Sequence, residues 1–273
     1  MTGKRSPFKR TKNHFVLQER DKQILVALYR WRFLTNDQIQ SLFDLGLPQV
    51  NIRLRKLFDN YFLSRRFLTN PYGRAKILHF LGPEAIEIVS EILKFDPLIV
   101  RKKRRRILKA RGSSLNHQLL INKFRLALTL ALRNNPQAGL EAWKNQKGIP
   151  LKSEKKFYAD AYFRLRFQNE IFNFFLEIDR SSRIRKQCHE KTEKYLQYGL
   201  EGYFERQFGF RFFRVLIVSP NPARVKNLLN VIKRQTDKMF WLTSWEMISP
   251  EKILSPIWFR PGKEELSSLL EVR

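Results

Sequence analysis

Hydrophobic positions recur every three or four residues in the first third of the chain, the spacing of amphipathic helices. Residues 19–31 carry this pattern and predict a first helix. Thr35-Asn36-Asp37-Gln38 fits a capping box and predicts a second helix, which Gly46 ends. Pro48 suits the first turn of a third helix that runs to about Asn60. The first part of the chain is therefore expected to begin with three helices.

Two β-rich runs follow the third predicted helix. Residues 62–68 and 75–81 flank an Asn-Pro…Gly turn, which predicts a β-hairpin. Three helices and a hairpin predict a winged helix-turn-helix over residues 18–96. In that fold the third helix enters the major groove and the hairpin lies along the DNA backbone. Polar and basic side chains on these two elements are the candidate DNA contacts: Gln49, Asn51, Arg53, Lys56, Arg65, Arg66, Arg74 and Lys76.

Helical and alternating patterns are mixed over residues 113–245. Pro136 and Gly139 end a long predicted helix, and two alternating runs around Gln168-Asn169-Glu170 predict a second hairpin. The predicted order is helix 115–133, strands 140–144, 157–167 and 171–179, helix 184–207, strand 212–218, helix 222–238 and strand 240–243. This order indicates an α/β sheet flanked by helices, followed by a C-terminal tail over residues 246–273.

The net charge of the chain predicts a polyanionic binding partner. The chain holds 53 Lys and Arg against 25 Asp and Glu, a formal net charge of +28. Eight of the eleven residues 101–111 are basic, which predicts an exposed basic linker over residues 97–112 and, with residues 1–17, two basic arms. The candidate phosphate contacts in the linker are Arg101, Lys102, Lys103, Arg104, Arg105 and Arg106. The alternatives for this run are a solvated surface or a nuclear localisation signal, and for the winged helix a basic face that is solvated or docks a protein.

Several other classes are excluded by composition. No apolar stretch approaches the ~20 residues of a membrane helix. The basic N-terminus lacks the apolar segment of a secretory signal. Cys188 is the only cysteine, which excludes an internal disulfide and a cysteine-based zinc site. We therefore expect a cytoplasmic protein with no membrane partner.

Three acidic residues stand out in the second hairpin. Glu177 and Asp179 lie two apart on one strand and share a face, and antiparallel pairing brings Asp160 alongside them. Such a cluster of carboxylates predicts a site for Mg²⁺, which activates water against a phosphodiester. The alternative is a surface salt network in which Glu177 and Asp179 pair with Arg180, Arg183 or Arg185.

Aromatic residues alternate with arginine in the same hairpin, which raises RNA binding as a third class. Exposed aromatics can stack on bases. The alternation assigns most of these side chains to the core and leaves Tyr158 and Tyr162 as candidate stacking residues.

The motifs taken together resemble the replication-relaxation proteins of bacterial plasmids and integrated mobile elements. The similarity is carried by RFLTNDQIQSLF and RLRKLF, by Asn116-His117, by Tyr158-Ala159-Asp160-Ala161, by FLEIDR over 175–180 and by KTEKYLQY over 191–198. It implies an α+β or α/β protein, with an N-terminal winged helix-turn-helix and a C-terminal restriction-endonuclease-like α/β domain. It also implies double-stranded DNA and mobile-element replication or transfer proteins as partners. Winged-helix proteins often form homodimers, although no heptad or apolar patch indicates one here.

The nuclease-like resemblance implies a specific active site. Its usual pattern is an Asp on one strand and Glu-x-Lys on the next. Asp160 and Glu177 fit the metal-binding acidic positions, but Asp179 stands in place of the lysine. Lys191 or Lys194 on the following helix is the candidate replacement. Two functions follow: a DNA-binding protein of a mobile element with a degenerate nuclease domain, or an active Mg²⁺-dependent endonuclease using Asp160, Glu177, Asp179 and Lys191.

Overall fold

The structure is a computed structural model that describes residues 9–12, 14–70, 73–149, 157–180 and 185–271. The chain forms two compact units, Met1–Asn122 and Lys123–Arg273, which are described separately below. Each unit combines helices with a β-sheet, so the fold is mixed α+β. Among the described residues, no helix is long and apolar enough to cross a membrane.

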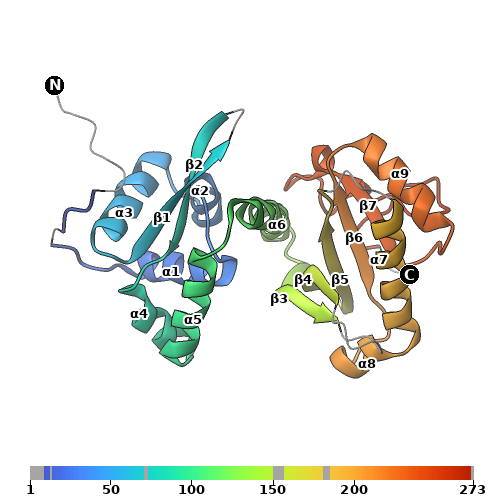
Figure 1. Ribbon diagram of the computed structural model, residues 1–273, viewed down its shortest axis with the longest axis horizontal. Helices are drawn as coiled ribbons and strands as arrows, with labels where there is room; N and C mark the ends of the chain where they lie inside the picture. Colours follow the sequence, from blue (N-terminus) through green and yellow to red (C-terminus); the bar gives the residue numbers. More distant parts are fainter. Residues whose placement is uncertain (1–8, 13, 71–72, 150–156, 181–184, 272–273) are drawn as a thin grey trace. The chain divides into compact units, whose positions relative to one another are not determined.

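The first unit begins with the three predicted helices. They are α1 (Glu19–Trp31), α2 (Asn36–Phe43) and α3 (Leu47–Asp59) (Figure 1). The capping box is confirmed, because Thr35 Oγ1 accepts from the Gln38 amide at 3.3 Å and Gln38 Oε1 accepts from the Thr35 amide at 3.1 Å. Pro48 lies in the first turn of α3, as expected, where its missing N–H costs no hydrogen bond.

The predicted first hairpin is also confirmed. Strands β1 (Leu63–Asn70) and β2 (Gly73–Leu81) pair antiparallel, with Leu63 opposite Leu81. Leu34, between α1 and α2, forms an isolated antiparallel bridge to His79 on the edge of β2 that does not pair with β1. The buried side chains packed around the hairpin are Phe33, Leu68, Leu78, Phe80 and Leu115.

Two helices follow the hairpin where the sequence predicted none. They are α4 (Ala85–Leu93) and α5 (Pro97–Leu108), so the predicted exposed linker is wrong for residues 97–108. Asp96 Oδ1 accepts from the Leu98 amide at 2.8 Å and caps α5, and Val100 is fully buried. The cap and the buried Val100 help to hold the helix, and Ile107 and Leu108 pack against the buried side chains around the hairpin.

The second unit contains a five-stranded mixed sheet in the order β3-β4-β5-β6-β7. Strands β3, β4 and β5 are antiparallel, and β5, β6 and β7 are parallel. The strands are β3 (Ala138–Ile149), β4 (Phe157–Phe167), β5 (Glu170–Ile178), β6 (Arg214–Ser219) and β7 (Phe240–Ser244). The predicted second hairpin is confirmed, with Ala161 opposite Leu176.

Helices cover both faces of this sheet. On one face lie α7 (Arg185–Leu200), α8 (Tyr203–Phe208) and α9 (Pro222–Lys233) (Figure 1). The sequence predicted one helix over 184–207, but Gly202 at φ +67° separates α7 from α8. The buried aromatic core on this face includes Phe175, Tyr195 and Phe213.

The opposite face packs against helix α6 (Gly112–Arg133), within which the chain divides into its two units. Phe124 of α6 contacts the rings of Phe163 and Trp258. Trp258 belongs to the predicted C-terminal tail and is completely buried, and its neighbour Phe259 bridges to Leu242 of β7. The segment after β7, which begins with the short 3₁₀ helix η1 (Trp245–Met247), is therefore part of the second unit's core.

Candidate functional site

Helix α3 presents a polar exposed face. Gln49, Asn51 and Lys56 are exposed, as the sequence predicted for a DNA-reading helix. Ile52 is 59% exposed on the same helix, and an apolar residue within a helical pattern gave no sequence signal for a place on this polar face. An exposed apolar side chain on such a face suits contact with a thymine methyl group. The exposed face of α3 therefore offers amide, cationic and apolar groups.

Arg53 does not belong to this exposed face. Its Nε donates to Asp21 Oδ1 at 2.6 Å, and its guanidinium lies 4.6 Å from the centre of the Phe15 ring. Asp21 is buried on α1, so this pair fastens α3 to α1. The predicted full exposure of Arg53 on this face is wrong, because the buried carboxylate of Asp21 binds its guanidinium; its role as a DNA contact stays a prediction.

The basic residues of the hairpin also turn inward in part. Arg65 donates to Leu54 O at 2.9 Å, and Arg66 donates to Ala110 O at 2.8 Å. Burial lowers the pKa of Arg65 to about 10, with the neighbouring Arg55 adding to the effect. Both arginines therefore hold the unit together, while Lys76 is exposed as predicted. The side chain of Arg74 lies outside the described residues.

Helix α5 divides its basic residues between an inner and an outer face. Arg104 donates to Leu81 O at 2.9 Å, and Lys103 lies 3.8 Å from the centre of the Tyr29 ring. These two residues anchor the helix and are not the exposed contacts predicted from the sequence. The basic residues exposed on α5 are Arg101, Lys102, Arg105 and Arg106, of which Arg101 pairs with Glu87 at 3.6 Å.

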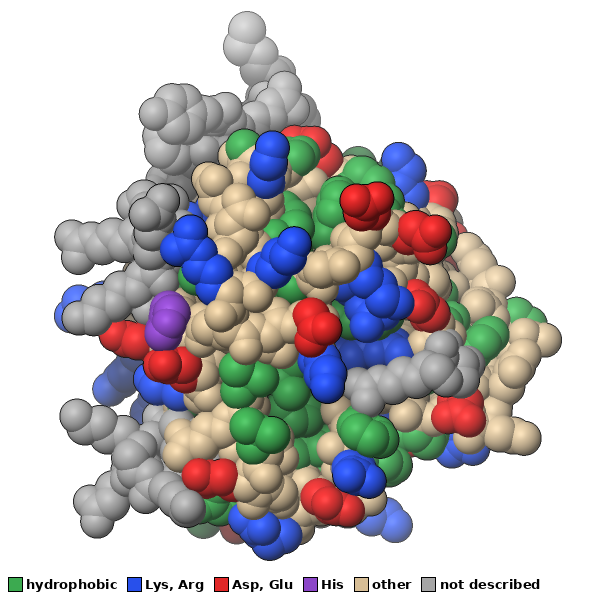
Figure 2. Space-filling view, turned by 90° about the vertical axis from the view of Figure 1, so that its right-hand side faces the viewer, with side chains coloured by type: hydrophobic (Ala, Val, Ile, Leu, Met, Phe, Trp, Pro, Cys, Tyr) green, Lys and Arg blue, Asp and Glu red, His purple; other side chains and the backbone are tan. Residues whose placement is uncertain are grey.

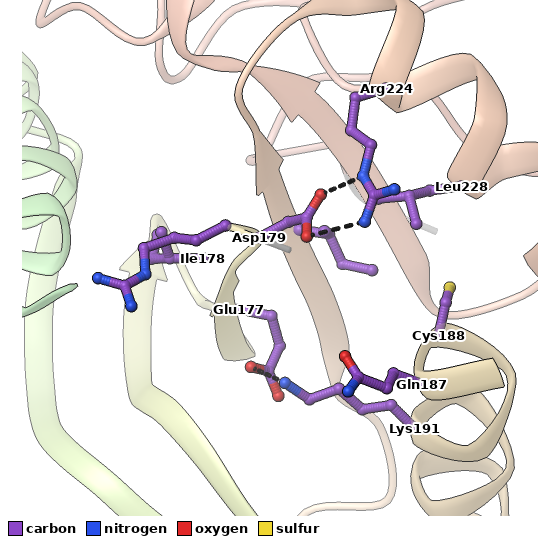
Figure 3. A pocket seen from close by; sticks show the side chains of 10 residues that line it. Glu177, Ile178, Asp179, Gln187, Cys188, Lys191, Arg224 and Leu228 are labelled. Carbon is purple, nitrogen blue, oxygen red and sulfur yellow. Dashed lines mark hydrogen bonds and ion pairs between the residues drawn. The ribbon is translucent and has the colours of Figure 1, made fainter. Parts of the chain in front are cut away.

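The acidic residues of the second unit lie at the end of β5 that faces α7 and α9. The β4–β5 pairing ends with Ala161 opposite Leu176, and the next residues on the two strands are Asp160 and Glu177, whose carboxylates are close enough for Asp160 to raise the pKa of Glu177. Asp160 Oδ2 accepts from the Ile178 amide at 2.8 Å. Glu177 lines a cavity of about 180 Å³ together with Asp179, Lys191 and Arg224 (Figure 3). The predicted strand pairing thus brings two of the three carboxylates together.

Glu177 is buried between two donors from α7. Its Oε1 accepts from the Tyr195 hydroxyl at 2.6 Å, and its Oε2 accepts from Lys191 Nζ. Burial raises the pKa of Glu177 to about 7, against the opposing effect of the Lys191 charge. Although burial opposes it, the nearby carboxylates of Glu177 and Asp160 raise the pKa of Lys191. The structure therefore places Lys191 against Glu177, one of the two helix lysines named from the sequence.

Asp179 is paired with an arginine. Arg224 on α9 forms a bidentate pair with it, at 2.6 Å from Nε and 3.1 Å from Nη2 (Figure 3). This pairing argues against the predicted convergence of three carboxylates on one metal ion. Of the arginines predicted as partners in a salt network, Arg183 and the side chain of Arg185 lie outside the described residues. Among the described residues, no group of three or more His, Cys, Asp or Glu is arranged to hold a metal ion.

Mg²⁺ fits the remaining pair in number and chemistry. It is commonly held by one or two carboxylates together with water and substrate phosphate. Asp160 and Glu177 supply two carboxylates on one face of the sheet, but Lys191 occupies Glu177 Oε2. A metal ion bound through that oxygen would have to displace Lys191.

The candidate RNA-stacking pair is split by burial. Tyr162 is 1% exposed, stacks on Phe208 at 4.3 Å between ring centres and donates to Asn173 Oδ1 at 2.7 Å. It is a core residue, so its assignment as a stacking residue is wrong. Tyr158 remains 57% exposed. Of the two candidate stacking residues, Tyr158 alone is therefore exposed.

We expect Glu177→Gln to reduce the pH dependence of stability in the second unit. A pKa raised to about 7 means that the folded state binds the proton more tightly, so the stabilisation is full below about pH 4.5 and is lost as pH rises through 7. The free energy of urea unfolding, followed by tryptophan fluorescence, should fall between about pH 5 and 7 in the wild type and less in the variant. Glu170→Gln, at an exposed position on β5, should behave as the wild type; equal slopes in all three proteins would contradict the assignment.

Comparisons with known proteins give one family and several weak structural similarities. The family model for replication-relaxation matches residues 25–211. No curated protein matches the sequence. A mutant of ZitR from Lactococcus lactis has a TM-score of 0.26 and 19% identity, over 44% of this chain and 78% of that one. The restriction endonuclease FokI has a TM-score of 0.30 and 11% identity, over 86% and 45%.

A third solved structure, protein VC1899 from Vibrio cholerae, has a TM-score of 0.25 and 15% identity, over 78% of this chain and 52% of that one. All three TM-scores are too low to assign a fold, whereas the family model covers well over half of the chain. The chain therefore belongs to the replication-relaxation family.

Proposed function

We propose that the protein binds double-stranded DNA through its first unit, in the manner of a winged helix-turn-helix. The family indicates a role connected with DNA. The observation that carries the proposal is the exposed face of α3, with Gln49, Asn51 and Lys56, preceded by a capped helix and followed by an antiparallel hairpin. A helix with amide and basic side chains reads base edges in the major groove, and the hairpin contacts the adjacent backbone.

Basic residues on two further elements would strengthen this binding. Lys76 on β2 and Lys102, Arg105 and Arg106 on α5 are exposed. Lysine and arginine on phosphates supply affinity without sequence preference. By contrast, the side of the second unit drawn in Figure 2 carries acidic and basic side chains interspersed. The exposed positive charge of the first unit is therefore the proposed DNA-binding surface.

Lysine protection tests where the DNA lies. Purified protein is acetylated with an amine-reactive reagent, with and without a random-sequence duplex, and modified sites are read by mass spectrometry. We expect the duplex to protect Lys56, Lys76 and Lys102 and to leave Lys226 and Lys233, which are exposed on α9, as reactive as before. Equal protection of both groups would contradict a binding surface on the first unit.

The second unit supports metal-dependent DNA cleavage as a second candidate function, within a restriction-endonuclease-like fold. The observation in its favour is the contact of Lys191 with buried Glu177 beside Asp160. Asp160 and Glu177 would hold Mg²⁺, which when bound activates water. Lys191, 41% exposed, would orient the attacking water, and Tyr195 holds Glu177 in place. Asp179 would take no direct part, because Arg224 neutralises it.

A nicking assay decides whether this second function is real. Supercoiled plasmid is incubated with Mg²⁺ or Mn²⁺ and the wild type, Asp160→Ala, or Glu190→Ala at an exposed position on α7. Cleavage requires nicking by the wild type and the Glu190 variant, and none by the Asp160 variant. If all three proteins leave the plasmid equally intact, the second unit is a degenerate nuclease domain and the DNA-binding function stands alone.

The biological setting follows from the family. We infer a cytoplasmic protein that acts on plasmid or mobile-element DNA with replication or transfer proteins, and that binds as a homodimer. Sedimentation of the complex with a short duplex measures how many protein chains bind each duplex. A single chain per duplex at all concentrations would contradict a dimer.

A further inference from the structure

A chain of hydrogen bonds links a buried histidine to the exposed face of α3. His79 Nε2 lies 2.7 Å from Asn36 Oδ1, and Asn36 Nδ2 donates to Asn51 Oδ1 at 2.6 Å. His79 is fully buried on β2, Asn36 is the first residue of α2, and Asn51 is exposed on α3. The chain thus runs from the core of the first unit to the surface proposed to meet DNA.

The direction of these hydrogen bonds can be derived from the chemistry of the three groups. Burial, together with the charge of Arg65, lowers the pKa of His79 to about 3, so the ring is neutral and carries one N–H. A carbonyl oxygen only accepts, so the proton lies on Nε2 and points at Asn36 Oδ1. This contact fixes the Asn36 amide, whose Nδ2 then faces Asn51.

The fixed amide in turn orients Asn51. Its Oδ1 faces Asn36, so its Nδ2, with two N–H donors, is turned away from α2 toward the exposed side. Donors match guanine N7 and O6, adenine N7 and thymine O4 in the major groove, whereas cytosine presents an N4 donor there. An asparagine held in this orientation therefore discriminates against cytosine.

We propose that His79 and Asn36 are positioning residues that fix Asn51 as a hydrogen-bond donor to a base, and so set the sequence preference of α3 at one position. This inference rests on the proposed DNA-binding function and deepens it. Neither residue touches the base. The His79 N–H fixes which side of the Asn36 amide accepts, and Asn36 in turn fixes which side of the Asn51 amide faces solvent.

Asn36→Asp reverses the direction of the hydrogen bond between residues 36 and 51, with little change in side-chain shape. Both carboxylate oxygens of Asp accept, so one receives the His79 N–H and the other receives Asn51 Nδ2. The Asn51 amide then turns its oxygen outward, where it accepts from cytosine N4 or adenine N6. An acidic residue at the first position of a helix is also compatible with the helix dipole. The variant therefore predicts a change of preferred base, which a merely structural role would not produce.

Selection from a random-sequence duplex library, with sequencing of the bound fraction, tests the inference. For the wild type we expect depletion of cytosine at one position by about tenfold. Asn51→Ala should lose the depletion of cytosine at that position and keep the preferences at the other positions. Asn36→Ala should weaken the depletion, and Asn36→Asp should enrich cytosine at the same position. Gln40→Glu adds the same charge to α2 at a residue outside the His79–Asn36–Asn51 hydrogen bonds. It should keep the wild-type base preferences.

The outcomes separate this inference from the function on which it rests. If the wild type does not retain the library, the proposed DNA binding fails. If it binds without base preference, or if Asn36→Asp and Asn36→Ala both keep the wild-type profile, the inference is overturned while DNA binding stands. Thermal unfolding identifies an unfolded Asn36→Asp protein, in which case the comparison between Asn36→Ala and Asn51→Ala decides.

Discussion

Gly82→Ala should unfold the first unit at temperatures where the wild type is folded. A Cβ at position 82 would lie 2.1 Å from Tyr61 O, 2.4 Å from Phe62 C and 2.6 Å from Leu63 N. All three are backbone atoms of the segment that joins α3 to β1, and the Gly82 amide donates to Phe62 O at 2.8 Å. Room for a methyl group requires this backbone to move, at a cost of about 3 kcal/mol or more. For a unit of this size that lowers the melting temperature by roughly 10 °C.

Hydrogen exchange followed by mass spectrometry measures the effect unit by unit. Amides of α1, α2 and α3 should lose protection in Gly82→Ala, and those of β6 and β7 should keep it. Gly112→Ala is the matched control. A Cβ added there would lie more than 4 Å from every heavy atom other than those of its chain neighbours and its own helix backbone. Equal protection in the Gly82 and Gly112 variants would mean that the link between α3 and β1 is not as closely packed as described.

Neutralising the exposed face of α5 should weaken DNA binding roughly a hundredfold at about 0.1 M salt. The variant is Lys102→Ala, Arg105→Ala and Arg106→Ala together. Each phosphate contact contributes about 0.9 to the slope of log affinity against log salt, so losing three lowers it by about 2.7. Alanine is a strong helix former, and Val100 and Arg104 stay in place to hold the helix.

Three exposed basic residues on α9 and at its C-cap provide a control with the same change of charge. Lys226→Ala, Lys233→Ala and Arg234→Ala together should leave the slope within about one contact of the wild type. Fluorescence anisotropy with a labelled duplex measures both variants. An equal loss in both would show that net charge, and not the α5 face, determines affinity.

Local signals in the sequence predicted much of the fold. The helix starts at Thr35 and Pro48 follow from side-chain chemistry within four residues, and both hairpins follow from alternation around a turn. The proximity of Asp160 to Glu177 was predictable because strand register fixes which residues share a face. Such features depend on near neighbours in sequence or on a regular period.

The errors concern partners that are distant in sequence. Eight basic residues in eleven indicated an open linker, but residue counts do not show that Val100 is buried or that Asp96 caps a helix. The spacing of Arg53 places it on the polar stripe of α3, but it forms an ion pair with Asp21, 32 residues earlier, and is partly buried. Asp179 shares a face with Glu177, and Arg224, 45 residues later, neutralises it. Each charge was visible in the sequence, while its counter-charge became apparent only with the fold.

The salt dependence of duplex binding by the wild-type protein tests the central claim most directly. The exposed residues Lys56, Lys76, Lys102, Arg105 and Arg106 offer five phosphate contacts. They predict a slope of log affinity against log salt of about −4.5, which corresponds to a loss of several hundredfold between about 50 and 200 mM salt. An affinity that stays constant across this range would contradict DNA binding through the basic surface of the first unit.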